Sequence, residues 1–119
     1  MDEATQLELV RKAILSRLGG CCEWDEQAAR RVRSDRSLQG LTPEEIKDRL
    51  QDYVTDHPEA VTARRESREE YRGVRDFWFR VVLPVPGFTH GLFLELVLED
   101  DADPDVPGVV IVSAHEQRP

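Results

Sequence analysis

The chain has 119 residues, of which 39% are hydrophobic and 34% are charged, and its formal net charge is −8. A chain of this length buries about two thirds of its unfolded surface, so we expect one domain over residues 1–119. No apolar run reaches the length of a membrane span, and no basic segment with an apolar stretch opens the chain. These features predict a cytoplasmic protein with no membrane partner. The acidity argues against strong non-specific nucleic-acid binding but leaves room for a local basic groove.

Charged residues are unevenly distributed along the chain. Residues 28–80 hold twelve of the sixteen Lys and Arg residues, whereas residues 81–119 hold seven acids and one arginine. The basic residues are thus concentrated in the middle of the chain.

The only cysteines are the adjacent pair Cys21 and Cys22. Neighbouring cysteines rarely bridge one another and lack a zinc-ligand spacing, so we expect reduced thiols.

Two segments near the N-terminus have helical periodicity. In residues 5–20 the apolar residues of one helix face are Leu7, Val10, Ile14 and Leu18. In residues 24–36 a narrower apolar stripe is formed by Trp24, Ala28 and Val32. The Gly19–Gly20 pair predicts the end of the first helix, and the second helix is predicted by its spacing alone.

A third helix has its own start and stop signals in "LTPEEIKDRLQDYV". Thr42 is a suitable N-cap, Pro43 suits the first helical position, and Glu45 completes a capping box. We expect this helix to end near Pro58, because the residue before a proline disfavours helical geometry.

After Pro58 the hydrophobic period changes to two, which predicts strands at residues 60–66, 76–84, 91–99 and 108–115. The linkers between the last three are rich in Pro and Gly, as hairpin loops are. The predicted fold is α+β. Two or three helices in residues 1–57 pack on one face of a three- or four-stranded antiparallel sheet in residues 58–119.

The alternation of the strands divides their side chains between two faces. The leucines of residues 91–99 form the core face, and we expect Val110, Val112 and Ala114 to share it. The opposite face then carries eight residues: Trp78, Arg80, Phe93, Glu95, Val109, Ile111, Ser113 and His115.

This opposite face combines aromatic and ionisable side chains. His115 as a general acid or base, Arg80 as a cation and Glu95 as the residue that orients them form a plausible acid–base site. Trp78 and Phe93 offer surfaces on which RNA bases stack. The alternative is structural, with Arg80 and Glu95 as a simple cross-strand pair and His115 in a frayed end.

Other candidate sites have simpler alternatives. Residues 62–77 hold five arginines, among them Arg72 and Arg75, which suit phosphate binding, although interleaved acids can neutralise them. The acidic residues 99–105 lack the ligand spacing of a calcium loop and predict a solvated hairpin loop. His57 and His90 are predicted as turn residues, and their spacing from His115 does not support a metal site. No phosphate-loop, hydrolase or dinucleotide motif is present, so we expect no metal and no cofactor.

Four stretches within residues 40–117 share a pattern with a known family: "LTPEEIKDRL", "VRDFWFRVVLP", "GLFLELVL" and "VVIVSAHE". With them the chain resembles the small α+β toxins with a RelE-like or barnase-like sheet. The closest pattern is that of mRNA interferases of the motility quorum-sensing regulator type. It implies an endoribonuclease that uses no metal, with RNA as substrate and an antitoxin as protein partner.

Carried over by position, the resemblance places Arg75 at a polar catalytic position. Phe93 stands where the family has a catalytic tyrosine, and His115 stands where it has a catalytic lysine. Phe93 is a departure because a phenyl ring has no hydroxyl, and a net charge of −8 departs from the basic character of the family.

Two hypotheses of function follow. In the first, the protein is a metal-independent endoribonuclease. Its catalytic residues are His115, Arg75, Arg80 and Glu95, and its substrate-binding residues are Trp78, Phe93 and Arg72. In the second, it is a non-catalytic binding module, immunity-like or regulatory, whose acidic C-terminal half covers a basic protein partner. The sequence leaves the oligomeric state open, including a dimer formed through the N-terminal helix.

Overall fold

The computed structural model describes residues 1–100 and 102–119, with the backbone alone at Asp100. Over these residues it has three α-helices, α1 (Glu3–Leu15), α2 (Glu26–Ser34) and α3 (Pro43–Asp56). The strands in the same residues are β1 (Cys22–Trp24), β2 (Thr62–Arg65), β3 (Phe77–Leu83), β4 (Leu92–Asp100) and β5 (Gly108–Glu116). No helix in this described part is both long enough and apolar enough to cross a membrane.

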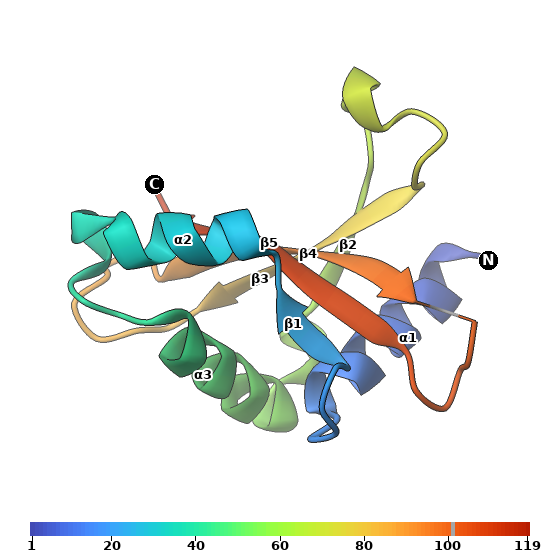
Figure 1. The fold of residues 1–119 in the computed structure, drawn as a ribbon, viewed down its shortest axis with the longest axis horizontal. Coiled ribbons are helices and arrows are strands. Elements are labelled where there is room, and N and C mark those ends of the chain that lie inside the picture. The colour runs from blue at the N-terminus through green and yellow to red at the C-terminus, as the bar shows by residue number, and fades with distance from the viewer. Residues whose placement is uncertain (101) are drawn as a thin grey trace.

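The strands form one sheet in the order β1-β5-β4-β3-β2 (Figure 1). The β1–β5 pair is parallel, and the other neighbours are antiparallel. The predicted α+β class is confirmed, but the sheet has five strands of mixed direction instead of three or four antiparallel ones. The extra strand, β1, lies in the part predicted to be helical. Three residues are too few to display a period of two, so its pairing is set by tertiary contacts.

The predicted helices begin and end largely where capping residues place them. Thr42 accepts a hydrogen bond from the Glu45 amide at 3.1 Å and Pro43 is the first residue of α3, as predicted. The first helix ends at Leu15, before Leu18, whose side chain lies outside the helix and is exposed. Trp24 belongs to β1 instead of to α2, and its indole nitrogen donates to the Pro43 carbonyl oxygen at 2.9 Å.

The core lies between α1, α3 and one face of the sheet. Its fully buried residues include Val10, Ile14, Ile46, Leu50, Val54, Phe79, Val81, Leu94, Leu96 and Ile111. The apolar stripe of α1 therefore packs against this chain's own sheet. Burial of these side chains, each worth about 1.5–3 kcal/mol, fixes α1 and α3 on that face.

A register shift in β5 decides which side chains face the core. Leu96 pairs with Ile111 and Glu95 pairs with Ser113, so Val112 is left without a partner in β4. Such a bulge reverses the alternation of the bulged strand. The prediction that Val109 and Ile111 lie opposite the core is therefore wrong, because both are buried in it.

Residues 66–76 connect β2 to β3 and project from the sheet (Figure 1). We call this segment the arm. Its two ends are joined where the Glu66 amide donates to the Asp76 carbonyl oxygen at 2.8 Å. The short helix Glu69–Tyr71 lies at its far part.

Candidate functional site

The sheet face opposite α1 and α3 carries the residues that the sequence singled out. We call it the open face and define it by Trp78, Arg80, Val82, Phe93, Glu95, Ser113 and His115. One row across β3, β4 and β5 consists of Arg80, Glu95 and Ser113, each opposite the next. The neighbouring row consists of Val82, Phe93 and His115. The prediction that Ser113 and His115 share a face with Phe93 and Glu95 is confirmed.

Aromatic rings form a continuous row across the open face. The His115 ring stacks on Phe93 with centroids 4.7 Å apart and an interplanar angle of 21°. Trp78 meets Phe93 edge-on at 6.2 Å. The Arg80 guanidinium carbon lies 5.9 Å from the Phe93 centroid, within the range of a cation–π contact. Phe93 is therefore the centre of a half-buried row that His115 extends into solvent.

Arg80 and Glu95 do not form the simple pair considered from the sequence. Glu95 instead accepts from Arg68, with Nη2 2.8 Å from Oε2 and Nη1 3.3 Å from Oε1. In the described part of the chain, Arg80 belongs to no ion pair. Its charge is consequently available beside the aromatic row.

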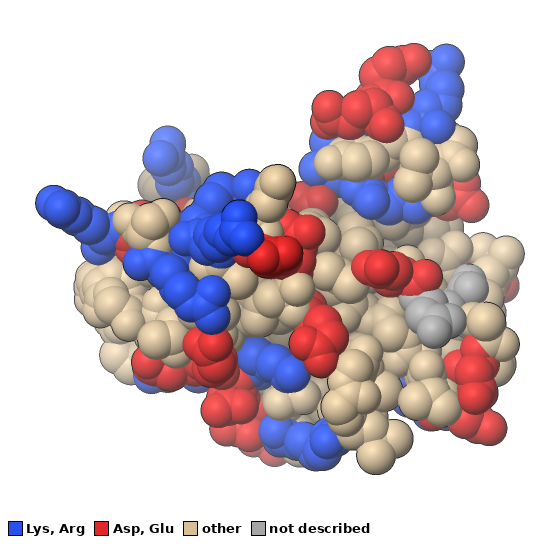
Figure 2. Space-filling view, viewed as in Figure 1, with Lys and Arg blue, Asp and Glu red and all other residues tan. Residues whose placement is uncertain are grey.

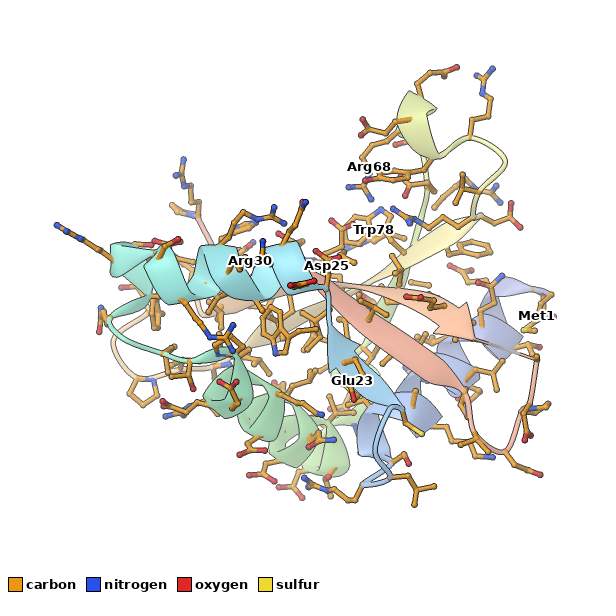
Figure 3. All side chains as sticks on the ribbon, viewed as in Figure 1. Met1, Glu23, Asp25, Arg30, Arg68 and Trp78 are labelled. Carbon is orange, nitrogen blue, oxygen red and sulfur yellow. The ribbon has the colours of Figure 1, made fainter. Side chains whose placement is uncertain are left out.

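Arg68 joins the arm to the open face. It donates through Nε to Glu66 at 2.8 Å and bridges from there to Glu95. Its guanidinium also lies 5.7 Å from the Trp78 ring, and Figure 3 labels both residues where the arm meets the sheet. The two carboxylates raise the pKa of Arg68 above its ordinary value, because both stabilise the charged guanidinium. The arm is thus held by a charged contact to the open face.

Glu66 is the centre of the charged contacts within the arm. Its side chain is only 2% exposed and also accepts from Arg75 Nε at 2.8 Å. The hydrogen bonds from Arg68, followed by those from Arg75, lower the pKa of Glu66 to about 2 against the opposing effect of burial. Tyr71 packs on both guanidinium groups, 4.9 Å from Arg68 and 3.8 Å from Arg75.

The remaining predicted residues therefore occupy different places. Arg75 lies inside the arm, bound to Glu66, and is not beside His115 on the open face. Arg72 is largely exposed on the arm and pairs with Glu69 at 3.2 Å. Arg68 and Glu66 are the residues that sequence reasoning did not assign. Their two-residue separation, which places both side chains on one side of an extended chain, was the available signal.

His115 is held in a defined place at the end of β5. The amide of Gln117 donates to the Gly91 carbonyl oxygen at 2.9 Å, so pairing continues past His115 and this end is not frayed. The Nδ1 atom lies 3.0 Å from the Glu116 carbonyl oxygen, which can only accept. Nδ1 is therefore the protonated nitrogen, and Nε2 carries the lone pair in the neutral ring.

The other candidate residues make local contacts. The β4–β5 loop is a hairpin loop in its described residues, where Lys12 Nζ donates to the Pro104 carbonyl oxygen at 2.9 Å; Asp101 and the Asp100 side chain lie outside the described residues. His57 pairs with Glu59 at 3.3 Å. In residues 1–100 and 102–119 no three His, Cys, Asp or Glu side chains are grouped to hold a metal ion. Burial raises the pKa of Cys22 to about 11, so its thiol stays protonated.

Fold and site together define an α+β protein with an aromatic and cationic sheet face. No family model, curated protein or solved structure matches the chain. The chemistry of the open face therefore rests on its own geometry. Rings with exposed faces can stack bases, and an arginine without a carboxylate partner can bind phosphate.

Proposed function

We propose that the protein is an endoribonuclease that binds unpaired RNA on the open face and cleaves it with its own side chains. The observation that carries the proposal is the Phe93–His115 stack, 4.7 Å between centroids, beside Arg80, which has no carboxylate partner among the described residues. Base stacking needs an aromatic surface, and phosphate binding beside it needs a cation. The activity is that of the toxin family which residues 40–117 resemble, and membership of that family is part of the proposal.

Cleavage at a 2′-hydroxyl needs a base, an acid and a cation. Glu95 and His115 are diagonal neighbours across β4 and β5, a relation that separates side chains by about 7–8 Å and leaves room for a phosphate between them. Glu95 takes the 2′ proton, and the 2′ oxygen attacks the adjacent phosphorus. His115, in its doubly protonated form, gives its Nε2 proton to the departing 5′ oxygen, which leaves a 2′,3′-cyclic phosphate and a 5′-hydroxyl end. Arg80 stabilises the charge that develops on the phosphate oxygens.

The first test is cleavage of a mixed-sequence RNA in the presence of EDTA. We expect fragments ending in cyclic phosphate from the native protein and a rate about 10²–10⁴ lower in His115→Ala, the usual contribution of a general acid or base. His90→Ala is the matched control, because His90 is exposed in the β3–β4 loop. Intact RNA with the native protein, or unchanged cleavage by His115→Ala, contradicts the proposal.

A non-catalytic binding module is the second candidate. It is favoured by one observation, namely that Glu95, the proposed base, is held by Arg68 at 2.8 Å. Arg68 occupies both carboxylate oxygens of Glu95, and these are the atoms that would have to accept the 2′ proton. RNA that is bound but left intact supports this candidate. If the native protein binds a basic protein but no RNA, the result supports a module that uses its acidic C-terminal half.

A further inference from the structure

Helix α2 borders the open face on the side opposite the arm. β1 ends at Trp24, and the Asp25 amide then donates to the Ile111 carbonyl oxygen at 2.9 Å, which starts α2 beside β5. Ala28, Ala29 and Val32 are the buried side of α2. The arm leaves the sheet from β2 and β3 at its other edge. The open face therefore lies between α2 and the arm (Figure 1).

The arginines of α2 differ in their partners. Arg30 pairs with Glu26 at 2.6 Å, and Arg33 pairs with Glu44 at 2.9 Å. Arg31 is exposed and has no carboxylate partner among the described residues. In Figure 2, Lys and Arg atoms gather over α2. An anion can therefore bind Arg31 without displacing a described carboxylate, whereas at Arg30 and Arg33 it would have to displace one.

Arg31 lies beside the bulge in β5. Among the described residues, its hydrogen-bond acceptor is the carbonyl oxygen of Val112, 3.5 Å from Nη2, a separation at the limit of a hydrogen bond. Val112 is the unpaired residue of β5, and Ser113 and His115 follow it on the open face. The guanidinium of Arg31 is thus weakly held next to the strand that carries His115.

We infer that Arg31 is a phosphate-binding group of the same site, so that the bound strand crosses the sheet from β3 to α2. The inference rests on the proposed function. Arg80 on β3 and Arg31 on α2 flank Phe93 and His115 from opposite sides. One strand reaches both cations only by running across β3, β4 and β5, with its bases on the aromatic row.

The test measures binding with a probe that cannot be cleaved. A fluorescent 2′-O-methyl oligoribonucleotide lacks the attacking hydroxyl, so its anisotropy reports affinity alone. We expect Arg31→Ala to weaken binding several-fold and to lower the slope of log affinity against log salt by about 0.7, the value for one phosphate contact on a single strand. Arg33→Ala on the same helix is the matched control and is expected to match the native protein, because its charge is already neutralised by Glu44.

Each outcome separates this inference from the proposed cleavage. If Arg31→Ala and Arg33→Ala lose the same affinity for the probe, or if Arg31→Ala loses none, the role of Arg31 is overturned. This holds even if the native protein cleaves RNA and His115→Ala does not. A selective loss in Arg31→Ala supports that role even if unmodified RNA remains intact. No binding of the probe by the native protein overturns both proposals. An alanine at this exposed helical position preserves the helix, so the variant is expected to fold.

Discussion

Phe93 is the residue on which the open face is organised, because Trp78, Arg80 and His115 all contact its ring. Its position in β4 also places it between Val82 and His115. A flat ring at this point gives a base a stacking surface, whereas a branched aliphatic chain of similar hydrophobicity does not.

Replacing Phe93 separates stacking from packing. We expect Phe93→Leu to weaken binding of the uncleavable oligonucleotide by about 1–3 kcal/mol, the worth of one base–aromatic stack, and Phe93→Tyr to bind as the native protein does. Both variants are compared by urea denaturation to establish that they fold. Native affinity in Phe93→Leu contradicts a stacking role for the aromatic row.

Among the elements, α1 depends on a polar side chain in the core. Gln51 of α3 is 5% exposed, and its amide nitrogen donates to the carbonyl oxygens of Ile14 at 3.2 Å and Ser16 at 3.3 Å. The last carbonyl groups of a helix have no partner within the helix. Gln51 therefore satisfies the end of α1 and joins α1 to α3.

Removing that amide is expected to destabilise the protein. Gln51→Met keeps the length of the side chain but leaves buried carbonyl groups unpaired, which costs about 1–3 kcal/mol in the free energy of unfolding. The control is Arg30→Met, which removes an exposed pair with Glu26 on α2 and is expected to cost less than about 1 kcal/mol. Urea denaturation with an unchanged m-value measures both. A Gln51→Met variant as stable as the native protein rules out this role.

The elements that sequence predicted well are those with strong local signals. Thr42 and Pro43 define the start of α3, and the alternation of β3 and β4 has a fixed phase because Arg80 and Glu95 mark the face away from the core. Residues 108–112 of β5 are apolar on both faces, so their alternation has no phase and the bulge at Val112 is not encoded in the pattern. For that reason the sequence placed Ser113 and His115 correctly and Ile111 incorrectly.

At the scale of the whole molecule, the candidate site depends on contacts between distant segments. Sequence alternation brings Trp78, Phe93 and His115 to one face, and the structure agrees. Arg68 reaches Glu95 across 27 residues of sequence, a contact that depends on how the arm is folded. The two-residue separation of Glu66 and Arg68 indicates their contact with each other, whereas the contact of Arg68 with Glu95 becomes visible only in the tertiary structure.

The arm links acid pH to the stability of the whole fold through Glu66. Its pKa is about 2 in the folded protein, below the ordinary 4.5 that the unfolded chain retains. The unfolded state therefore binds more protons between these values, and the stabilisation is complete above about pH 4.5 and lost as pH falls toward 2. We expect Glu66 to contribute about 2 kcal/mol to the free energy of unfolding. This is less than the free energy that corresponds to its whole pKa shift, because Arg68 is 39% exposed and water screens the contact.

Denaturation between pH 6 and pH 2.5 tests this link. The native protein should lose stability more steeply than Glu66→Gln, so that the difference between them narrows as the pH falls, because the variant has no carboxylate to protonate. Glu69→Gln is the control, since Glu69 is 77% exposed in its pair with Arg72 and is expected to follow the native curve. Parallel curves for the native protein and Glu66→Gln would mean that the contacts of Arg68 and Arg75 with Glu66 do not stabilise the fold. In that case Glu66 would not stabilise the position from which Arg68 reaches Glu95.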